Sequence, residues 1–230
     1  MSAESTESLS TLVLRRHSTR LFLPDHCVPR STLLEALHLA QHAPSNSNIQ
    51  PWHVEFVEGE RRSRLCAALL EESRLHPREM AALPPCFAPF RRALGSQVYG
   101  SMGIARDDFA SRAAAVARNY DAFGAPTIGI VSVHRELGPV DHLSVGMWLQ
   151  TLLLALTERH VDSCVEASLA TYHEVVRREL HLPDERVVLV GIAIGYADPN
   201  FPANHICTPR NPLDLHVTFL DNLEDPPSEH

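Results

Sequence analysis

The amino-acid sequence predicts an α+β fold in which many helices surround a few strands. Two observations lead to this fold class. Apolar residues recur at helical spacing through most of the chain, whereas clear strand patterns are confined to residues 52–57, 127–133 and 187–194. The chain has 230 residues, of which 44% are hydrophobic and 21% charged, and this composition is ordinary for a globular protein. We therefore expect a single domain over residues 1–230.

The first part of the chain predicts two helices and a strand. Residues 9–16 place apolar side chains on one helical face, which ends on Arg16. A capping-box pattern at 32–35 predicts the start of the second helix, which ends at Pro44. Apolar and polar residues alternate at 52–57, as in a half-buried strand.

The middle of the chain predicts two more helices and a buried strand. The first helix follows Gly59 and runs to about residue 75. Residues 77–106 are rich in proline and glycine, and we expect them to be the least ordered part, a functional insertion or lid. A helix then begins at Asp107–Asp108 and runs to about 120, and a β-branched strand follows at 127–133.

The last part of the chain holds the most apolar segments. The helix expected at 139–160 is apolar on nearly every side, which predicts burial in a core or at a subunit interface. A short strand is expected at 161–165, and a second capping box at 171–174 predicts a helix to about 180. The strand at 187–194 is apolar on both faces and should lie centrally.

The two termini have different expected roles. After Gly195 the chain becomes proline-rich, which predicts an arm that wraps a surface or a partner. We expect residues 1–4 and 222–230 to be disordered, the latter as part of an acidic tail.

Composition excludes several partners and sites. A formal net charge of −8 argues against nucleic acid, because binding phosphates needs clustered Lys and Arg. The most apolar segment, 143–156, is shorter than the ~20 residues of a membrane span. Five scattered cysteines without a signal-peptide pattern predict free thiols and a cytoplasmic location. His38 and His42 have metal-ligand spacing, but no further ligands complete a site, so we expect no metal.

One polar stretch lies where a helix gives way to a strand. The sequence A-P-S-N-S-N-I-Q-P-W at 43–52 places uncharged amides and hydroxyls between Pro44 and Pro51. Such groups suit a ligand rich in donors and acceptors, as the edge of a planar heteroaromatic ring is. Taken alone, the stretch is also typical of a solvated turn.

A second stretch, R-R-H-S-T-R at 15–20, lies at the end of the first expected helix. The chain has no G-x-x-x-x-G-K-[ST], no G-x-G-x-x-G after a strand and no G-x-S-x-G. A phosphorylated cofactor would therefore be held by arginine side chains. Arg16 and Arg210 are the candidates, and Arg15 is expected to be solvent-exposed.

Together the two stretches resemble the flavin-binding signature of the nitroreductase-like superfamily. The matching residues are Arg16, His17, Ser18 and Arg20 in the first stretch and Pro44, Ser45, Asn48, Gln50, Pro51 and Trp52 in the second. The resemblance implies a nitroreductase-like fold with a central mixed sheet flanked by helices. It also implies an intertwined homodimer with a C-terminal arm and two FMN sites, in which one subunit contributes the first stretch and the other contributes the second.

The resemblance also implies roles for individual residues. The segment at 164–168 would lie along the flavin and offer a backbone N–H near its N5, and Arg20 would face the pyrimidine edge. Glu166 stands where relatives often have Gln, and its side chain either disfavours an anionic reduced ring or points outward. Cys207 stands where relatives often have a basic residue, which leaves one fewer charge for the phosphate. The implied cofactor contacts are Arg16, His17, Ser18, Arg20, Pro44, Ser45, Asn46, Asn48, Gln50, Val165, Glu166, Ala167 and Arg210, and no side chain is expected to act as acid or base.

The function implied by the resemblance is an FMN-dependent oxidoreductase. It would pass hydride from NADH or NADPH to a small electron-poor acceptor, such as a nitroaromatic compound or a quinone, by a ping-pong mechanism. A narrower flavoenzyme of the same superfamily stays open: a dehydrogenase, a dehalogenase or a flavin-consuming enzyme. Two non-enzymatic alternatives are a flavin-binding or storage protein and a cofactor-free interaction module.

Overall fold

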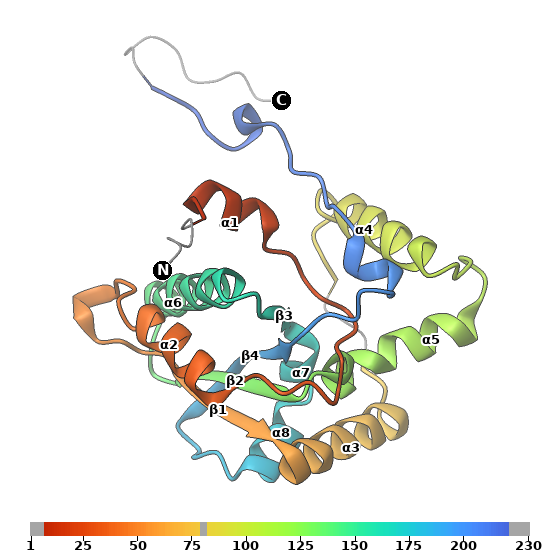
Figure 1. The fold of residues 1–230 in the computed structure, drawn as a ribbon, viewed down its shortest axis with the longest axis horizontal. Coiled ribbons are helices and arrows are strands. Elements are labelled where there is room, and N and C mark those ends of the chain that lie inside the picture. Colours follow the sequence, from red (N-terminus) through yellow and green to blue (C-terminus); the bar gives the residue numbers. More distant parts are fainter. Residues whose placement is uncertain (1–6, 79–81, 221–230) are drawn as a thin grey trace, which may run out of the picture.

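The structure is a computed structural model that describes residues 7–78 and 82–220. The disorder expected at residues 1–4 and 222–230 concerns residues outside these ranges. A four-stranded sheet lies at the centre with helices on both faces (Figure 1). The strands are β1 (His53–Glu58), β2 (Thr127–His134), β3 (Asp162–Glu166) and β4 (Arg186–Gly195). Each expected strand is confirmed.

The strand order is β1-β2-β4-β3, and every pair of neighbours is antiparallel. The strand expected to lie centrally, β4, is indeed an inner strand. The prediction of a mixed sheet is wrong for the part of the chain that the structure describes. β2 and β3 run in the same direction, but β4 lies between them and runs the opposite way, so no parallel strands are neighbours. β3 is an edge strand, so one side of its backbone does not face a described strand.

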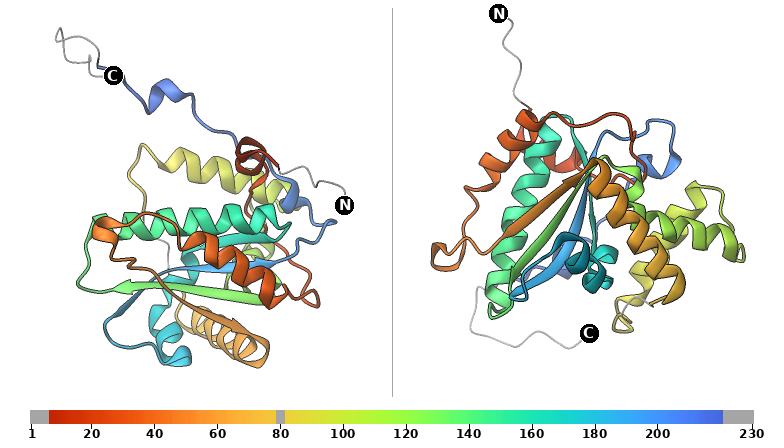
Figure 2. Two further views of the ribbon diagram at one scale, coloured as in Figure 1. Left: turned by 60° about the vertical axis from the view of Figure 1, so that its left-hand side comes forward. Right: turned by 90° about the horizontal axis from the view of Figure 1, so that it is seen from below.

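One face of the sheet is covered by α2 (Arg30–Ala40) and α6 (Pro139–Glu158) (Figure 2). Leu152 and Leu156 of α6 are fully buried in a cluster that includes Val131 of β2 and Ile192 of β4. Burying a side chain of this size stabilises the fold by about 1.5–3 kcal/mol. The expected helix at 139–160 is therefore confirmed. Its burial is incomplete, because Val140 and Leu143 near its start are 61% and 65% exposed.

The other face is covered by α3 (Gly59–Leu75), α7 (Ala167–Thr171) and α8 (His173–Leu180), with the 3-10 segment η2 (Arg118–Gly124) beside them. Leu65 and Leu69 of α3 are fully buried there. A Cβ at Gly191 of β4 would lie 2.2 Å from Cδ1 of Leu169, so α7 packs against this strand as closely as glycine permits.

Two helices, α4 (Ala88–Ser101) and α5 (Phe109–Ala117), project from one side of this layered body (Figures 1 and 2). The prediction that 77–106 is the least ordered part is therefore wrong over much of its length. Pro89 sits in the first turn of α4, where its missing N–H costs no hydrogen bond. Asp108 caps α5 by accepting from the Ser111 N–H, as the start expected at residues 107–108 implies.

The first helix, α1 (Leu9–Arg15), begins at Ser8, whose Oγ accepts from the Thr11 N–H. The helix is confirmed, but its expected apolar face is only partly covered. Leu12 is buried, whereas Leu9 and Val13 are 68% and 49% exposed, because α1 packs against α6 along a narrow strip.

Both capping-box predictions are wrong. α2 begins two residues before Thr32, with Pro29 at its N-cap, because the fixed φ of proline already suits a helix start. Thr171 is the last residue of α7, and α8 begins after Tyr172 without a side-chain cap bond. Tyr172 is buried against Tyr120, so packing of this ring sets the boundary.

After β4 the chain passes through η3 (Pro202–His205) and continues as an exposed arm that contains η4 (Leu213–Leu215). This arm extends away from the body (Figure 1). It carries five exposed apolar side chains, Leu213, Leu215, Val217, Phe219 and Leu220. Over residues 7–78 and 82–220, the helices are too short or too polar to cross a membrane.

Candidate functional site

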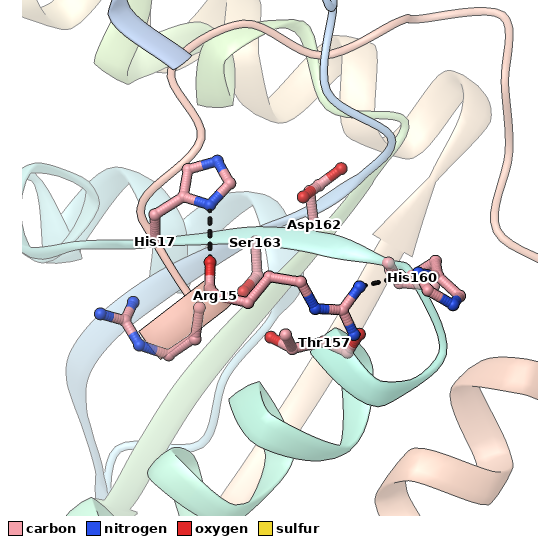
Figure 3. A pocket seen from close by; sticks show the side chains of 8 residues that line it. Arg15, His17, Thr157, His160, Asp162 and Ser163 are labelled. Atoms are coloured by element: carbon pink, nitrogen blue, oxygen red, sulfur yellow. Dashed lines mark hydrogen bonds between the residues drawn. The ribbon is translucent and has the colours of Figure 1, made fainter. Parts of the chain in front are cut away.

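A pocket of about 240 Å³ lies at the end of α1, beside the start of β3 (Figure 3). Both the first sequence stretch and the end of α6 contribute residues to its lining. The lining residues are Arg15, Arg16, His17, Thr157, His160, Val161, Asp162 and Ser163. The structure therefore places two of the predicted cofactor contacts, Arg16 and His17, in one pocket.

The two adjacent arginines of this pocket have different surroundings. Arg15 donates to the carbonyl oxygen of Thr157 at 2.6 Å and lies 2.7 Å from Nδ1 of His160. It is half-buried, so its expected exposure to solvent is wrong, because its guanidinium lies against the last turn of α6 and donates to a carbonyl oxygen there. Arg16 also lines the pocket, yet within residues 7–78 and 82–220 its guanidinium has no hydrogen-bond partner.

The rest of the first stretch runs along the open edge of the sheet. The Thr19 N–H donates to the carbonyl oxygen of Ser163 on β3. Ser18 and Arg20 are half-buried on either side of it, and Nη1 of Arg20 donates to the Ser18 carbonyl oxygen at 3.1 Å. Val165, two residues further along β3, is half-buried on the same side of the strand as Ser163. The predicted contacts Ser18, Arg20 and Val165 therefore lie at one edge of the sheet.

Glu166 ends β3 with a buried side chain. It is 3% exposed, and neither carboxylate oxygen has a hydrogen-bond partner among the described residues. Burial, with a smaller contribution from the nearby Asp121, raises the pKa of this carboxyl well above its usual range. The alternative of an outward-facing side chain is therefore wrong. The uncharged acid is favoured, and in shape and polarity it is close to Gln. Ala167, the first residue of α7, is exposed.

The second stretch forms a strained 3-10 turn, η1 (Asn46–Asn48). Ser47, Asn48 and Gln50 have φ values of 49°, 56° and 47°, a region that side chains other than those of Asn and Asp rarely adopt. The Gln50 N–H donates to the Ser45 Oγ at 3.0 Å and fixes the turn from inside. Pro44 and Asn48 are exposed.

Asn46 is bound to the start of α6. Its backbone N–H donates to the Ser144 Oγ at 3.1 Å, and its side-chain Nδ2 donates to Asp141 at 3.2 Å. Asp141 also accepts from the Gly138 N–H. Neither partner was predicted from the sequence, although polar residues within the largely apolar segment at 139–160 are a signal that could have identified them.

The two stretches lie at opposite ends of α6. The first contacts Thr157 and the second contacts Ser144, and at about 1.5 Å of rise per residue these positions are about 20 Å apart along the helix. In Figure 1, α1 and the loop before β1 lie in different parts of the molecule. Within one chain, the structure does not bring the two predicted halves of the site together.

Arg210 lies on the C-terminal arm. Its Nη1 donates to the Thr208 and Pro209 carbonyl oxygens and to the Thr208 Oγ1, at 2.8–3.1 Å. The pocket of Arg16 is lined by other residues, so one chain does not bring these two arginines together.

Other parts of the described chain offer different features. A wider hollow of about 640 Å³ lies between α3 and α5, and its lining includes Tyr120 and Tyr172. Among residues 7–78 and 82–220, no three His, Cys, Asp or Glu side chains gather as a metal site would require. Two residues outside both stretches, Arg118 and Asn204, hydrogen-bond to the backbone of Arg20. Neither residue was predicted to have a role from the sequence.

Comparison with known proteins gives a consistent result. The family model described as "Nitroreductase family" matches residues 13–196. A 4-nitrobenzoate reductase from Nocardioides sp. (strain LMS-CY) is 34% identical, over 95% of this chain and 92% of its own length. The nitroreductase NfnB from Mycolicibacterium smegmatis is 34% identical, over 93% of each chain.

Solved structures agree with these sequence matches. The FMN and NADPH-dependent nitroreductase NfnB from Sphigopyxis sp. strain HMH superimposes with a TM-score of 0.89 at 35% identity, covering 94% of this chain and 100% of its own. The FMN-dependent NfnB from Mycobacterium smegmatis, in complex with NADPH, gives 0.85 at 34% identity, covering 92% and 97%. This chain belongs to the nitroreductase family.

Proposed function

We propose that this chain is an FMN-dependent oxidoreductase that takes hydride from NADPH or NADH and reduces a small electron-poor acceptor, such as a nitroaromatic compound or a quinone. Relatives at about one third identity over nearly the whole chain are named as reductases of 4-nitrobenzoate and as an FMN and NADPH-dependent nitroreductase. These names favour a nitroaromatic acceptor and NADPH as donor.

The pocket at the end of α1 is the observation that carries the cofactor assignment. A guanidinium without a partner, in a half-buried recess, is free to form paired hydrogen bonds to a phosphate. Arg16 has this environment, and His17 lines the same recess. These residues fit the phosphate end of FMN. Arg210, on the arm, is the proposed second phosphate contact.

The edge of the sheet next to this pocket suits the flavin ring. When bound, FMN supplies the electron chemistry. The chain's own residues bind and orient it: the backbone at 165–167 offers polar groups to one ring edge, and Arg20 places a positive charge at the pyrimidine edge. The buried Glu166 is favoured as the uncharged acid, so it does not oppose negative charge on a reduced ring.

The separation along α6 supports a site shared between two chains. Groups that grip one ring must lie within a few ångströms of its edge, whereas the two stretches of one chain are about 20 Å apart along α6. Ser45, Asn48 and Gln50 would then contact the flavin held by the partner's first stretch. Asn46 instead serves to fix this loop on α6.

Exposed apolar side chains support a second copy of this chain as the partner. Leu9 and Leu14 of α1 are 68% and 85% exposed, and Leu143 of α6, the helix against which α1 packs, is 65% exposed. The arm adds further exposed apolar residues. Large apolar side chains that stay exposed on α1, on α6 and on the arm are typical of surfaces that bind a partner, so we propose an intertwined homodimer with the arm on the other subunit.

Because the sequence has no separate nicotinamide-binding motif, donor and acceptor would occupy the same space over the flavin in turn, which predicts ping-pong kinetics. We propose residues 77–106, with α4 at their centre, as the variable part that limits which acceptors enter. α4 contacts the C-terminal segment through Gln97, which donates to the Cys207 carbonyl oxygen at 2.9 Å. We also propose a single domain and a cytoplasmic location, which the five free thiols support.

Three absorbance spectra of the purified protein test the function. The protein should carry a flavin absorbance, which should bleach on anaerobic addition of NADPH and return on addition of a nitrobenzoate. A flavin that is bound but reduced by neither NADPH nor NADH would replace this proposal with a flavin storage role. If the purified protein binds no flavin, the remaining alternative is a cofactor-free interaction module.

A further inference from the structure

We propose that Asn204 and Arg118 are positioning residues that hold the backbone of Arg20 and so aim its side chain at the flavin ring. This inference rests on the proposed function, in which Arg20 faces the pyrimidine edge. Neither residue belongs to the two stretches that carry the flavin resemblance.

Asn204 binds two consecutive residues of the first stretch. Its Oδ1 accepts from the Arg20 N–H at 2.6 Å and from the Leu21 N–H at 3.2 Å. Its Nδ2 donates to the carbonyl oxygens of Leu21 and Asp198, at 2.8 and 3.0 Å. Asn204 is only 5% exposed, so four good hydrogen bonds satisfy a buried amide that would otherwise be costly.

Arg118 binds the same residue from the other side. Its Nη2 donates to the Arg20 carbonyl oxygen at 2.8 Å. Its guanidinium lies over the ring of Phe201, 4.3 Å from the ring centre, and Nη1 approaches the sulfur of Met102. These contacts hold the Arg118 guanidinium in position beside Arg20. The N–H and the carbonyl oxygen of Arg20 are therefore both bound by side chains from distant parts of the chain.

The consequence concerns the side chain of Arg20. A cation stabilises charge on a ring only if it keeps its distance and direction when the charge appears. The residue before Arg20 is also restrained, because the Thr19 N–H donates to the carbonyl oxygen of Ser163 on β3. If one of these hydrogen bonds is removed, the positive charge of Arg20 is still present, but its position relative to the ring is no longer fixed.

The test compares Arg118→Met with Arg118→Lys, which keeps a cation near the Arg20 carbonyl oxygen. Arg177→Met is the matched control, because Arg177 also donates to backbone carbonyl oxygens, at a turn between α8 and β4. We expect Arg118→Met to make the flavin reduction potential more negative and to slow anaerobic reduction by NADPH about tenfold, the loss of one modest transition-state interaction. Arg118→Lys should recover part of both effects, and Arg177→Met should change neither.

A double-mutant cycle separates positioning from a general structural effect. If Arg118 acts through Arg20, Arg118→Met should have no further effect on the potential once Arg20→Ala is present. Equal effects in both backgrounds would overturn the inference. An unchanged potential in Arg20→Ala would overturn it together with the ring assignment of Arg20, whereas a changed potential in Arg20→Ala with none in Arg118→Met would overturn the positioning role alone.

Asn204 provides a second measurement that does not depend on activity. Asn204→Leu, with a side chain of similar size, removes the oxygen that accepts from both amides and also removes both donors. In the flavin-free protein, we expect hydrogen exchange at the Arg20 and Leu21 amides to accelerate more than tenfold, while exchange on β4 stays unchanged. Unchanged protection of these two amides would contradict the holding role of Asn204.

Discussion

The backbone N–H of Asn46 donates to Oγ of Ser144 at 3.1 Å, which fixes the second sequence stretch to the start of α6. At the other end of the same helix, Arg15 of the first stretch donates to the Thr157 carbonyl oxygen. The two stretches, which are near each other in sequence, are therefore held at opposite ends of one helix. This separation determines how a site made from both stretches can be assembled.

The buried carboxyl of Glu166 predicts a pH-dependent stability. The raised pKa means that the folded protein keeps a proton which the unfolded chain releases above its ordinary pKa of about 4.3. The folded state therefore binds more protons between these two pKa values, and stability falls as pH rises through this window. Glu166→Gln should abolish this contribution and stabilise the protein at pH 8.

The measurement is denaturant unfolding at several pH values between 4 and 9, at one protein concentration and with saturating FMN. Glu60→Gln, on the exposed start of α3, is the control and should leave the slope unchanged. A Glu166→Gln protein with the same pH slope as the wild type would show that the carboxyl is ionised in the folded state.

The five cysteines should fall into two reactivity classes. Burial raises the pKa of both Cys66 and Cys164 to about 12, so their thiolate forms are scarce near neutral pH. Cys27, Cys86 and Cys207 are exposed. Alkylation of the folded protein at pH 8, followed by mass spectrometry, should modify these three first and the other two only after unfolding. Early modification of Cys66 or Cys164 would contradict the packing described for α3 and β3.

Local patterns predicted most elements, because their signals lie within a few neighbouring residues. α3 follows Gly59 and ends at Leu75 as expected, and β4 is an inner strand because both of its faces are apolar. Both capping boxes failed, because tertiary contacts and Pro29 set the helix starts. The burial of Glu166 was undetermined for the same reason, since its surroundings include Cys66 and Asp121 from distant parts of the sequence.

The site was predicted in part. Resemblance identified both stretches, and the structure places Arg16 and His17 in one pocket. No local pattern marks Asn204 as a partner of Arg20, because the two residues meet only when the chain returns after β4. The separation of the two stretches also depends on α6, which follows them in sequence by about a hundred residues.

The phosphate assignment predicts a selective loss of affinity. Arg16→Ala and Arg210→Ala should each remove a charge-assisted hydrogen bond worth about 1.5–3 kcal/mol, which weakens FMN binding by about tenfold to a hundredfold. Riboflavin, which lacks the phosphate, should bind almost unchanged. Fluorescence titration of both ligands measures the difference, with Arg61→Ala on the exposed side of α3 as control. Equal losses for FMN and riboflavin would refute the assignment.

The last prediction concerns the shared site. Asn48→Asp places a carboxylate in the second stretch, where desolvation and the reduced ring both disfavour it. Arg20→Ala damages the first stretch. If each site takes one stretch from each subunit, a heterodimer of the two variants has one intact site and one site with both lesions. Mixing the inactive variants should then restore activity, towards half of the wild-type value in the heterodimer fraction.

Refolding the two variants together, one of them with an affinity tag, allows the heterodimer to be isolated and its FMN content counted. Size exclusion of each variant alone verifies that both still assemble. A mixture of Asn48→Asp with Asn48→Ala is the matched control, because both lesions then lie in the same stretch and no intact site can form. Confirmed heterodimers of Asn48→Asp and Arg20→Ala that stay inactive would mean that each chain builds its own site. The two stretches of one chain, which contact α6 at positions about 20 Å apart along the helix, would then have to approach one another.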